Sequence, residues 1–305
     1  MTRQRAKARE AYRALEQGEY HFCTDGLKGA DIFYSIADYA LGMILMGLIC
    51  IKYCITIYAF TLMPNHIHII LSGTGANCLR AFDYLKRKLS ARLKKTGHAP
   101  LPKDYWFKLE RIDSPEQMRR EIIYVLRNAL EKGLAQVAGW LWGSGWIYHS
   151  DMCSLLRVAP AWKPAKYTLE KMLGGVEHIP ENWHLHKYLG LLPDSFVDTS
   201  LVYSLFPSPK DLQTALVKDY EVYFQMASRL GEVVSFSNAE IENIVEQTLQ
   251  KRFDGRALRA LSDEDRGKLA IILNREFGLS SYQISTSIYI KEKTVRQLLS
   301  SKELR

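Results

Sequence analysis

The segment from Tyr53 to Ser72 constrains the fold more than any other part of the sequence. Its first half, Tyr53 to Leu62, is rich in β-branched and aromatic residues, whereas in its second half, His66 to Ser72, the histidines alternate with aliphatic residues. Met63-Pro64-Asn65 interrupts the extended run between them. This pattern predicts two strands separated by a turn. Because side chains alternate along a strand, both histidines of the second strand lie on one face and Ile67, Ile69 and Leu71 on the other.

The flanking sequence supplies the other elements of an α+β domain. The helix that begins at Ser114 has a serine N-cap, a proline in its first turn and Gln117 three residues on, as in a capping box. The order strand, helix, strand, strand, helix, strand, helix predicts a ferredoxin-like antiparallel sheet with helices on one face. The remaining predicted elements are a strand at Tyr20–Thr24, helices at Asp31–Ile51 and Ala76–Lys95, a strand at Trp106–Ile112, and the last helix to about Lys132.

The length of 305 residues allows two domains. We expect a first domain over residues 1–150, an irregular, proline-punctuated connection over 151–210, and a helical region over 211–305. Residues 263–301 resemble a helix-turn-helix, with helices at Asp263–Phe277, Ser280–Ser285 and Lys291–Leu299. The last of these resembles a recognition helix that reaches bases or phosphates through Thr294, Arg296 and Gln297. A plain helical bundle or a dimerisation element is the alternative.

Charge and cysteine content narrow the functional class. The chain has 41 Lys and Arg against 33 Asp and Glu, a net charge of +8, which suits a polyanionic partner. Its five cysteines form no CxxC pair, so we expect reduced thiols in a cytoplasmic protein. The apolar run Tyr39 to Ile51 is shorter than the ~20 residues of a membrane span, and the N-terminus lacks the features of a signal peptide. We therefore expect no membrane partner.

Two histidines and a later helix carry the candidate chemistry. His66 and His68 point the same way from one strand, so both imidazoles can converge on one metal ion, although a further ligand must come from elsewhere. Tyr124 and Asn128 are four residues apart and share a helix face. A phenol beside an oxygen ligand is the arrangement that metal-assisted attack on a phosphodiester requires.

These motifs resemble those of a known family. Leu62-Met63-Pro64-Asn65-His66-Ile67-His68 is similar to the histidine-hydrophobe-histidine (HUH) strand of the single-tyrosine transposases, above all the REP-associated tyrosine transposases. The family's later helix resembles Tyr124 to Leu134, and its Trp-Ser element resembles Trp142-Gly143-Ser144. The resemblance covers roughly residues 15 to 150. It departs at Ala129, where the family usually has proline.

The resemblance implies an enzyme that cuts and rejoins single-stranded or hairpin DNA. Tyr124 would be the nucleophile, and His66, His68 and Asn128 would hold Mg²⁺ or Mn²⁺. The products of cleavage would be a 5′-phosphotyrosine and a free 3′-OH, and the protein would act as a monomer or homodimer. We expect phosphate contacts from the basic helix, through Arg80, Lys86, Arg87, Lys88, Arg92, Lys94 and Lys95, and duplex DNA contacts from the C-terminal module.

Other interpretations remain open. His66 and His68 could be structural, and Tyr84 is a rival nucleophile on the basic helix. A second His-x-His pair, His184 and His186, lacks an alternating strand around it, so we expect a structural role. A non-catalytic DNA-binding regulator that keeps the fold is the alternative from another functional class. A replication initiator or relaxase is a nearer rival, although such enzymes often carry paired tyrosines or three histidines.

Overall fold

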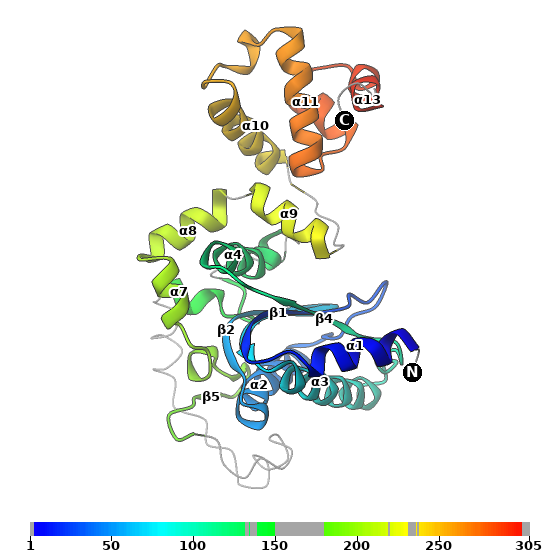
Figure 1. Cartoon of the computed structure of the whole chain (residues 1–305), viewed down its shortest axis with the longest axis vertical. Helices are drawn as coiled ribbons and strands as arrows, with labels where there is room; N and C mark the ends of the chain where they lie inside the picture. Colours follow the sequence, from blue (N-terminus) through cyan, green and yellow to red (C-terminus); the bar gives the residue numbers. More distant parts are fainter. Residues whose placement is uncertain are drawn as a thin grey trace. The chain divides into compact units, whose positions relative to one another are not determined.

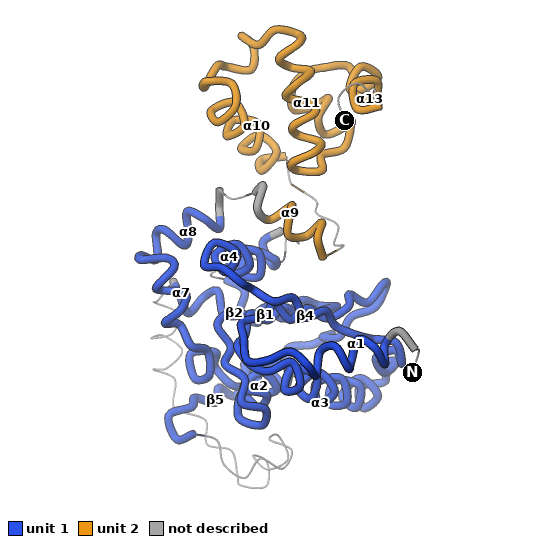
Figure 2. The backbone as a smooth tube through the Cα atoms, in the orientation of Figure 1, with its two compact units in different colours: residues 1–216 blue, residues 217–305 orange. Residues whose placement is uncertain are grey.

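The computed structural model describes residues 3–131, 134, 139–149, 180–218, 220–230, 236 and 238–300 (Figure 1). The chain divides into two compact units, Met1–Leu216 and Val217–Arg305, shown in different colours in Figure 2. Each unit is described by itself. Residues 150–179 of the expected connection, including Cys153, lie outside the described residues.

An antiparallel four-stranded sheet forms the centre of the first unit, in the order β2-β3-β1-β4. Helix α2 connects β1 to β2, and α3 connects β3 to β4, so the chain has the predicted β-α-β-β-α-β order. The fold is therefore α+β, as the sequence predicted. The bounds are β1 Gly18–Thr24, α2 Ile36–Tyr53, β2 Thr56–Met63, β3 His66–Gly73, α3 Gly75–Lys95 and β4 Phe107–Arg111; α1, Arg3–Arg13, precedes them.

The turn at Pro64-Asn65 fixes how β2 and β3 pair. Met63 lies opposite His66, and Thr61 lies opposite His68. The Pro64 carbonyl accepts hydrogen bonds from the backbone N–H groups of residues 32 and 33, at 2.6 and 3.1 Å, which ties the loop before α2 to this turn. Because the register is set at the turn, the alternation of β3 places its histidines on a single face of the sheet.

Helices cover both faces of the sheet (Figure 1). Phe22 of β1 points toward α3, where its ring centroid lies 6.4 Å from that of Phe82. The neighbouring residue, His21, points the other way, toward α4 (Pro115–Glu131). The prediction that the helices lie on one face is therefore wrong for α4. Strands β1 and β3 are the inner strands and are buried on both sides, so each face needs a covering layer.

Helix α2 is the apolar helix of the core. Ser35 caps its N-terminus by accepting a hydrogen bond from the Asp38 N–H, and Cys54 ends it in the left-handed conformation with φ 50°. By length and composition alone α2 could cross a membrane, but half of its apolar window is buried inside the protein. It packs against α3, β2 and β6, as expected for a buried helix.

Residues 139–149 and 180–216 pack onto the same unit. Trp142 and Ser144 pair with the edge of β2, through Leu62 N–H to Trp142 O at 2.8 Å and Ser144 N–H to Phe60 O at 2.9 Å. Where the sequence suggested an irregular connection, residues 180–216 form short elements that reach the same strand. The elements of the two segments are η2 Gly145–His149, β5 Leu185–His186, β6 Gly190–Leu191, η3 Pro193–Ser195, α7 Ser200–Leu205 and α8 Pro209–Lys218.

The described part of the second unit is helical and has its own core. Ile284, Ile288 and Val295 are completely buried in it. Gly278 ends α11 in the left-handed conformation, and Ser280 with Gln283 forms a capping box at the start of α12. The elements are α9 Tyr220–Leu230, α10 Asn238–Arg252, η4 Leu258–Ala260, α11 Asp263–Phe277, α12 Ser281–Ile288 and α13 Glu292–Ser300.

We predict that Gly47→Ala destabilises the first unit although alanine favours helices. A methyl group at Gly47, within α2, would overlap the side chain of Leu191 and lie 2.9 Å from Trp183 Cζ3. Such overpacking costs about 1–3 kcal/mol. The matched control is Gly267→Ala in α11, where the new methyl meets Leu298 at 3.7 Å and should stabilise by about 0.5–1 kcal/mol. Hydrogen exchange of α2 and α11 peptides measures both effects, and equal effects at the two positions would contradict this packing.

Candidate active site

The structure brings His66, His68, Tyr124 and Asn128 together between the sheet and α4. The His68 ring lies 4.7 Å from the His66 ring and 5.3 Å from the Tyr124 ring, centroid to centroid. The Asn128 amide nitrogen lies 3.4 Å from His68 Nε2. Residues that are sixty positions apart in the sequence thus form one cluster.

Helix α4 presents its part of this cluster because its first turn is well defined. Ser114 Oγ accepts a hydrogen bond from the Gln117 N–H at 3.1 Å, and Gln117 Oε1 accepts one from the Asp113 N–H at 3.1 Å. The serine therefore caps the helix as the capping-box pattern predicted, whereas the glutamine binds the N–H group of Asp113, one residue before the N-cap, instead of that of Ser114. From this start, Tyr124 and Asn128 both fall on the face that meets β3.

Two further residues belong to the cluster. His21 of β1 lies with Nε2 3.0 Å from His68 Nδ1, and its Nδ1 lies 2.7 Å from Glu121 Oε2. No sequence motif assigned a role to His21 or to Glu121. A signal for Glu121 was present, because it precedes Tyr124 by three residues and Asn128 by seven, which places all three on one helix face.

All six side chains are buried, from His66 at 5% exposed to Tyr124 at 0%. Buried polar groups are costly unless they are hydrogen bonded, so such a concentration inside a small domain marks a candidate functional site. The burial has a second consequence. In this arrangement the Tyr124 hydroxyl cannot touch a DNA phosphate, so any reaction with DNA requires the cluster to open first.

The side chains of the cluster offer nitrogen and oxygen ligands that fit a divalent metal ion between the hard and soft classes. Asn128 Oδ1 is buried and has no hydrogen-bond partner among the described residues, so its lone pairs are available to a cation. In the part of the chain that the structure describes, no three His, Cys, Asp or Glu side chains form a metal-binding group. A site here would therefore combine two imidazoles with an amide oxygen. Such a set suits Mn²⁺ better than Mg²⁺, which prefers oxygen ligands.

The basic residues of α3 lie on the opposite side of the sheet from this cluster. Lys86 donates hydrogen bonds to the carbonyls of Lys103 and Tyr105, and burial lowers its pKa below the ordinary value. Arg92 donates to Asp38 at 2.6 Å. These two cations thus have partners within the protein. Among the residues of α3 that were predicted to contact phosphates, the exposed ones are Arg80, Arg87, Lys94 and Lys95.

Tyr84, the rival nucleophile, is also on α3 and away from the histidines. Lys52, Arg87 and Lys88 lie over its ring at 5.5 to 5.7 Å, and burial raises its pKa. It therefore acts as a packing residue for the basic side chains of this helix in the described structure.

The second His-x-His pair serves a turn. His186 Nδ1 accepts hydrogen bonds from the backbone N–H groups of residues 188 and 189, at 3.3 and 3.2 Å. This agrees with the structural role expected for it.

The three predicted DNA contacts of the C-terminal module are exposed on α13. Thr294, Arg296 and Gln297 all lie outside the core, while Val295 between them is buried. Arg296 is engaged by Glu292, one turn earlier in the helix, at 2.8 Å. The ion pair is exposed, so it is weak and can exchange for a phosphate.

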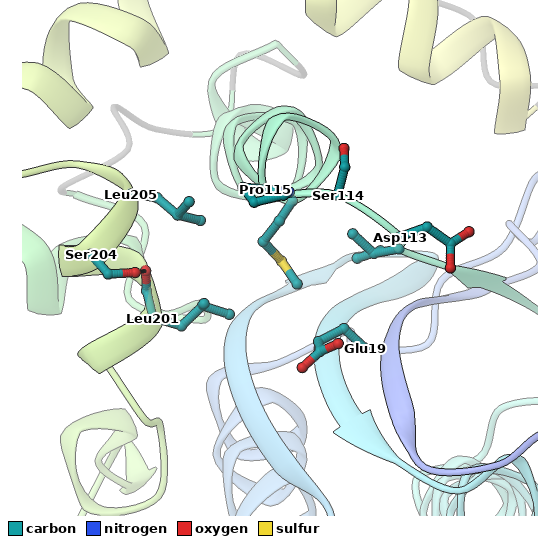
Figure 3. Close-up of a pocket in the computed structure, with 9 residues that line it drawn as sticks. Glu19, Asp113, Ser114, Pro115, Leu201, Ser204 and Leu205 are labelled. Atoms are coloured by element: carbon teal, nitrogen blue, oxygen red, sulfur yellow. Dashed lines mark hydrogen bonds between the residues drawn. The ribbon is translucent and has the colours of Figure 1, made fainter.

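A cavity of about 300 Å³ lies beside the start of α4 (Figure 3). Its walls are mainly apolar, from Ile112, Met118 and Leu201 among others, and its polar groups include the carboxylates of Glu19 and Asp113. None of its lining residues is basic. A cavity of this chemistry repels a phosphate, so it is not the binding site for a scissile phosphodiester.

No family model matches the sequence, and no curated protein matches it. A solved structure described as the REP associates tyrosine transposase bound to a REP hairpin is similar at 17% identity. The similarity covers 50% of this chain and 90% of that chain, with a TM-score of 0.36. This is a distant likeness.

We predict that Tyr124 is protected from chemical modification in the free protein. Tyr289 is 80% exposed and Tyr124 is 0% exposed, so hydroxyl radicals should oxidise Tyr289 rapidly and Tyr124 only after opening of the cluster. Mass spectrometry of oxidised peptides measures both rates in one sample. Equal rates would mean that the cluster is open in solution.

Proposed function

We propose that this protein is a metal-dependent, single-stranded DNA endonuclease and strand transferase, a transposase of the HUH type, with Tyr124 as its nucleophile. The observation that carries the proposal is the position of the Tyr124 ring, 5.3 Å from His68, in a buried cluster that also holds Asn128. A phenol, two imidazoles and the Asn128 amide oxygen, which has no hydrogen-bond partner among the described residues, are an uncommon set to bury at one point of a core, and such a concentration supports a functional site.

The resemblance to the HUH transposases implies the chemistry, and these side chains can supply its reacting groups. The Tyr124 oxygen forms a bond to phosphorus while the bond from phosphorus to the 3′ oxygen breaks. The phenol loses its proton, the departing oxygen gains one, and a 5′-phosphotyrosine and a free 3′-OH result. His66, His68 and Asn128 would hold Mg²⁺ or Mn²⁺. A bound cation would stabilise negative charge on the phosphate in the transition state. The reverse attack by a 3′-OH rejoins DNA.

The charged surfaces suggest where DNA binds. The net charge of +8 and the exposed cations of α3, including Arg80, Arg87, Lys94 and Lys95, suit a single strand or hairpin. In the second unit, three residues separate α12 from α13, and both helices contribute buried side chains to one hydrophobic core. This arrangement suits a helix-turn-helix that binds duplex DNA through α13. We also propose that the protein is cytoplasmic and acts as a monomer or a homodimer.

The test is formation of a covalent protein–DNA adduct. Labelled hairpin DNA with single-stranded flanks is incubated with the protein and Mn²⁺, and adducts that resist denaturant are resolved by gel electrophoresis. We expect an adduct with the wild type and none with Tyr124→Phe, because phenylalanine keeps the ring but lacks the attacking oxygen. His68→Ala and chelation by EDTA should also abolish it.

The matched control is Tyr84→Phe, which removes the hydroxyl of another buried tyrosine and should leave adduct formation unchanged. An adduct that survives Tyr124→Phe would refute the assignment of the nucleophile. Binding of the hairpin without an adduct, across a panel that includes DNA flanking the gene, would favour a non-catalytic DNA-binding regulator.

A further inference from the structure

A continuous chain of hydrogen-bonded side chains connects α4 to the central strand. Glu121 Oε2 lies 2.7 Å from His21 Nδ1, and His21 Nε2 lies 3.0 Å from His68 Nδ1. The three groups come from three different elements, α4, β1 and β3. All are at most 1% exposed, so water does not compete for these hydrogen bonds.

The chemistry of Glu121 sets the position of each proton along the chain. A carboxylate only accepts hydrogen bonds, so the ring N–H of His21 is on Nδ1. Neutral His21 then has its lone pair on Nε2 and accepts a hydrogen bond from His68 Nδ1. His68 therefore carries its N–H on Nδ1 and its lone pair on Nε2. The Asn128 amide group lies 3.4 Å from this Nε2, so it adjoins the ring nitrogen on which the assignment leaves the lone pair.

His66 is held in the same way by its neighbour. Its Nδ1 lies 2.7 Å from Asn65 Oδ1, and an amide oxygen only accepts hydrogen bonds. The N–H of His66 is therefore on Nδ1, and its lone pair is on Nε2. Both histidines of the pair thus present the same ring nitrogen, in the form that binds a metal ion.

We propose that Glu121 and His21 are positioning residues that hold His68 in the Nδ1–H form and so set its Nε2 for metal binding. This inference rests on the proposed function and deepens it, because it assigns roles to two residues outside the ligand set. Hydrogen bonds of this kind to a ligating histidine fix its tautomer and its orientation, and their loss typically weakens metal binding 10- to 100-fold.

A hydrogen bond between Glu121 and His21 that only stabilises the fold would give different experimental results. A structural pair would alter the unfolding midpoint and leave the tautomer of His68 and the affinity for metal unchanged. The tautomer is therefore the property that separates the two roles.

The experiment measures the tautomer and metal binding directly, without DNA. Long-range ¹H–¹⁵N correlation spectra of the histidine-labelled, metal-free protein distinguish Nδ1–H from Nε2–H forms, and the His68→Ala spectrum assigns the signals. We expect His68 to be Nδ1–H in the wild type. In Glu121→Gln the amide can also donate to His21, so the Nε2–H form of His68 should appear, and Mn²⁺ affinity measured by calorimetry should fall about 10- to 100-fold.

The matched control is Glu116→Gln, the same change at an exposed position of α4, which should alter neither property. An Nε2–H form of His68 in the wild type overturns the inference without any variant, as does unchanged Mn²⁺ affinity in a folded Glu121→Gln protein. Failure of the wild type to bind Mn²⁺ would instead overturn the proposed function, so the two failures are distinguishable.

Discussion

The packing of α4 across the second face of the sheet is the constraint on which the rest of the structure depends. Strands β1 and β3 are inner strands that carry buried side chains on both faces. Helices α2 and α3 cover one face, and without α4 the other face would be open to water at His21, His68 and Ile70. The same contact that closes the core brings Tyr124 and Asn128 to the histidines. One contact, between α4 and the sheet, thus both completes the core and assembles the cluster.

The contact of α4 with the sheet is partly polar. Its polar cluster lies beside buried apolar residues of the same helix, including Ile122 and Val125, and the hydrogen bonds of the cluster replace those that water would provide, so they add less net stability than an equal apolar contact. Opening of the layer would expose the Tyr124 hydroxyl, which is otherwise inaccessible. The chain from Glu121 to His68 would break at the same time, because its members come from α4 and from the two inner strands.

The basic helix α3 and the cluster lie on opposite faces of the sheet (Figure 1). Under the proposed function, a DNA strand held by the exposed cations of α3 would have to pass around an edge of the sheet to reach the side of α4. Part of the basic character of α3 serves the protein itself. Burial alone would raise the pKa of Asp38, but hydrogen bonds from Arg92 and Ser35 outweigh it and hold this pKa below its usual value. The ionised Asp38 carboxylate therefore holds the Arg92 side chain of α3 against α2.

The sequence by itself determined the elements and four of the six residues of the cluster. The alternation of His66 to Ser72, the capping residues from Ser114 and the spacing of Tyr124 and Asn128 are local properties, because periods of two and 3.6 decide which side chains share a face. Only the tertiary structure decided which face of the sheet α4 covers and that His21 and Glu121 join the site. Those facts depend on the strand order β2-β3-β1-β4, which places β1 beside β3 through contacts distant in sequence that no local pattern records.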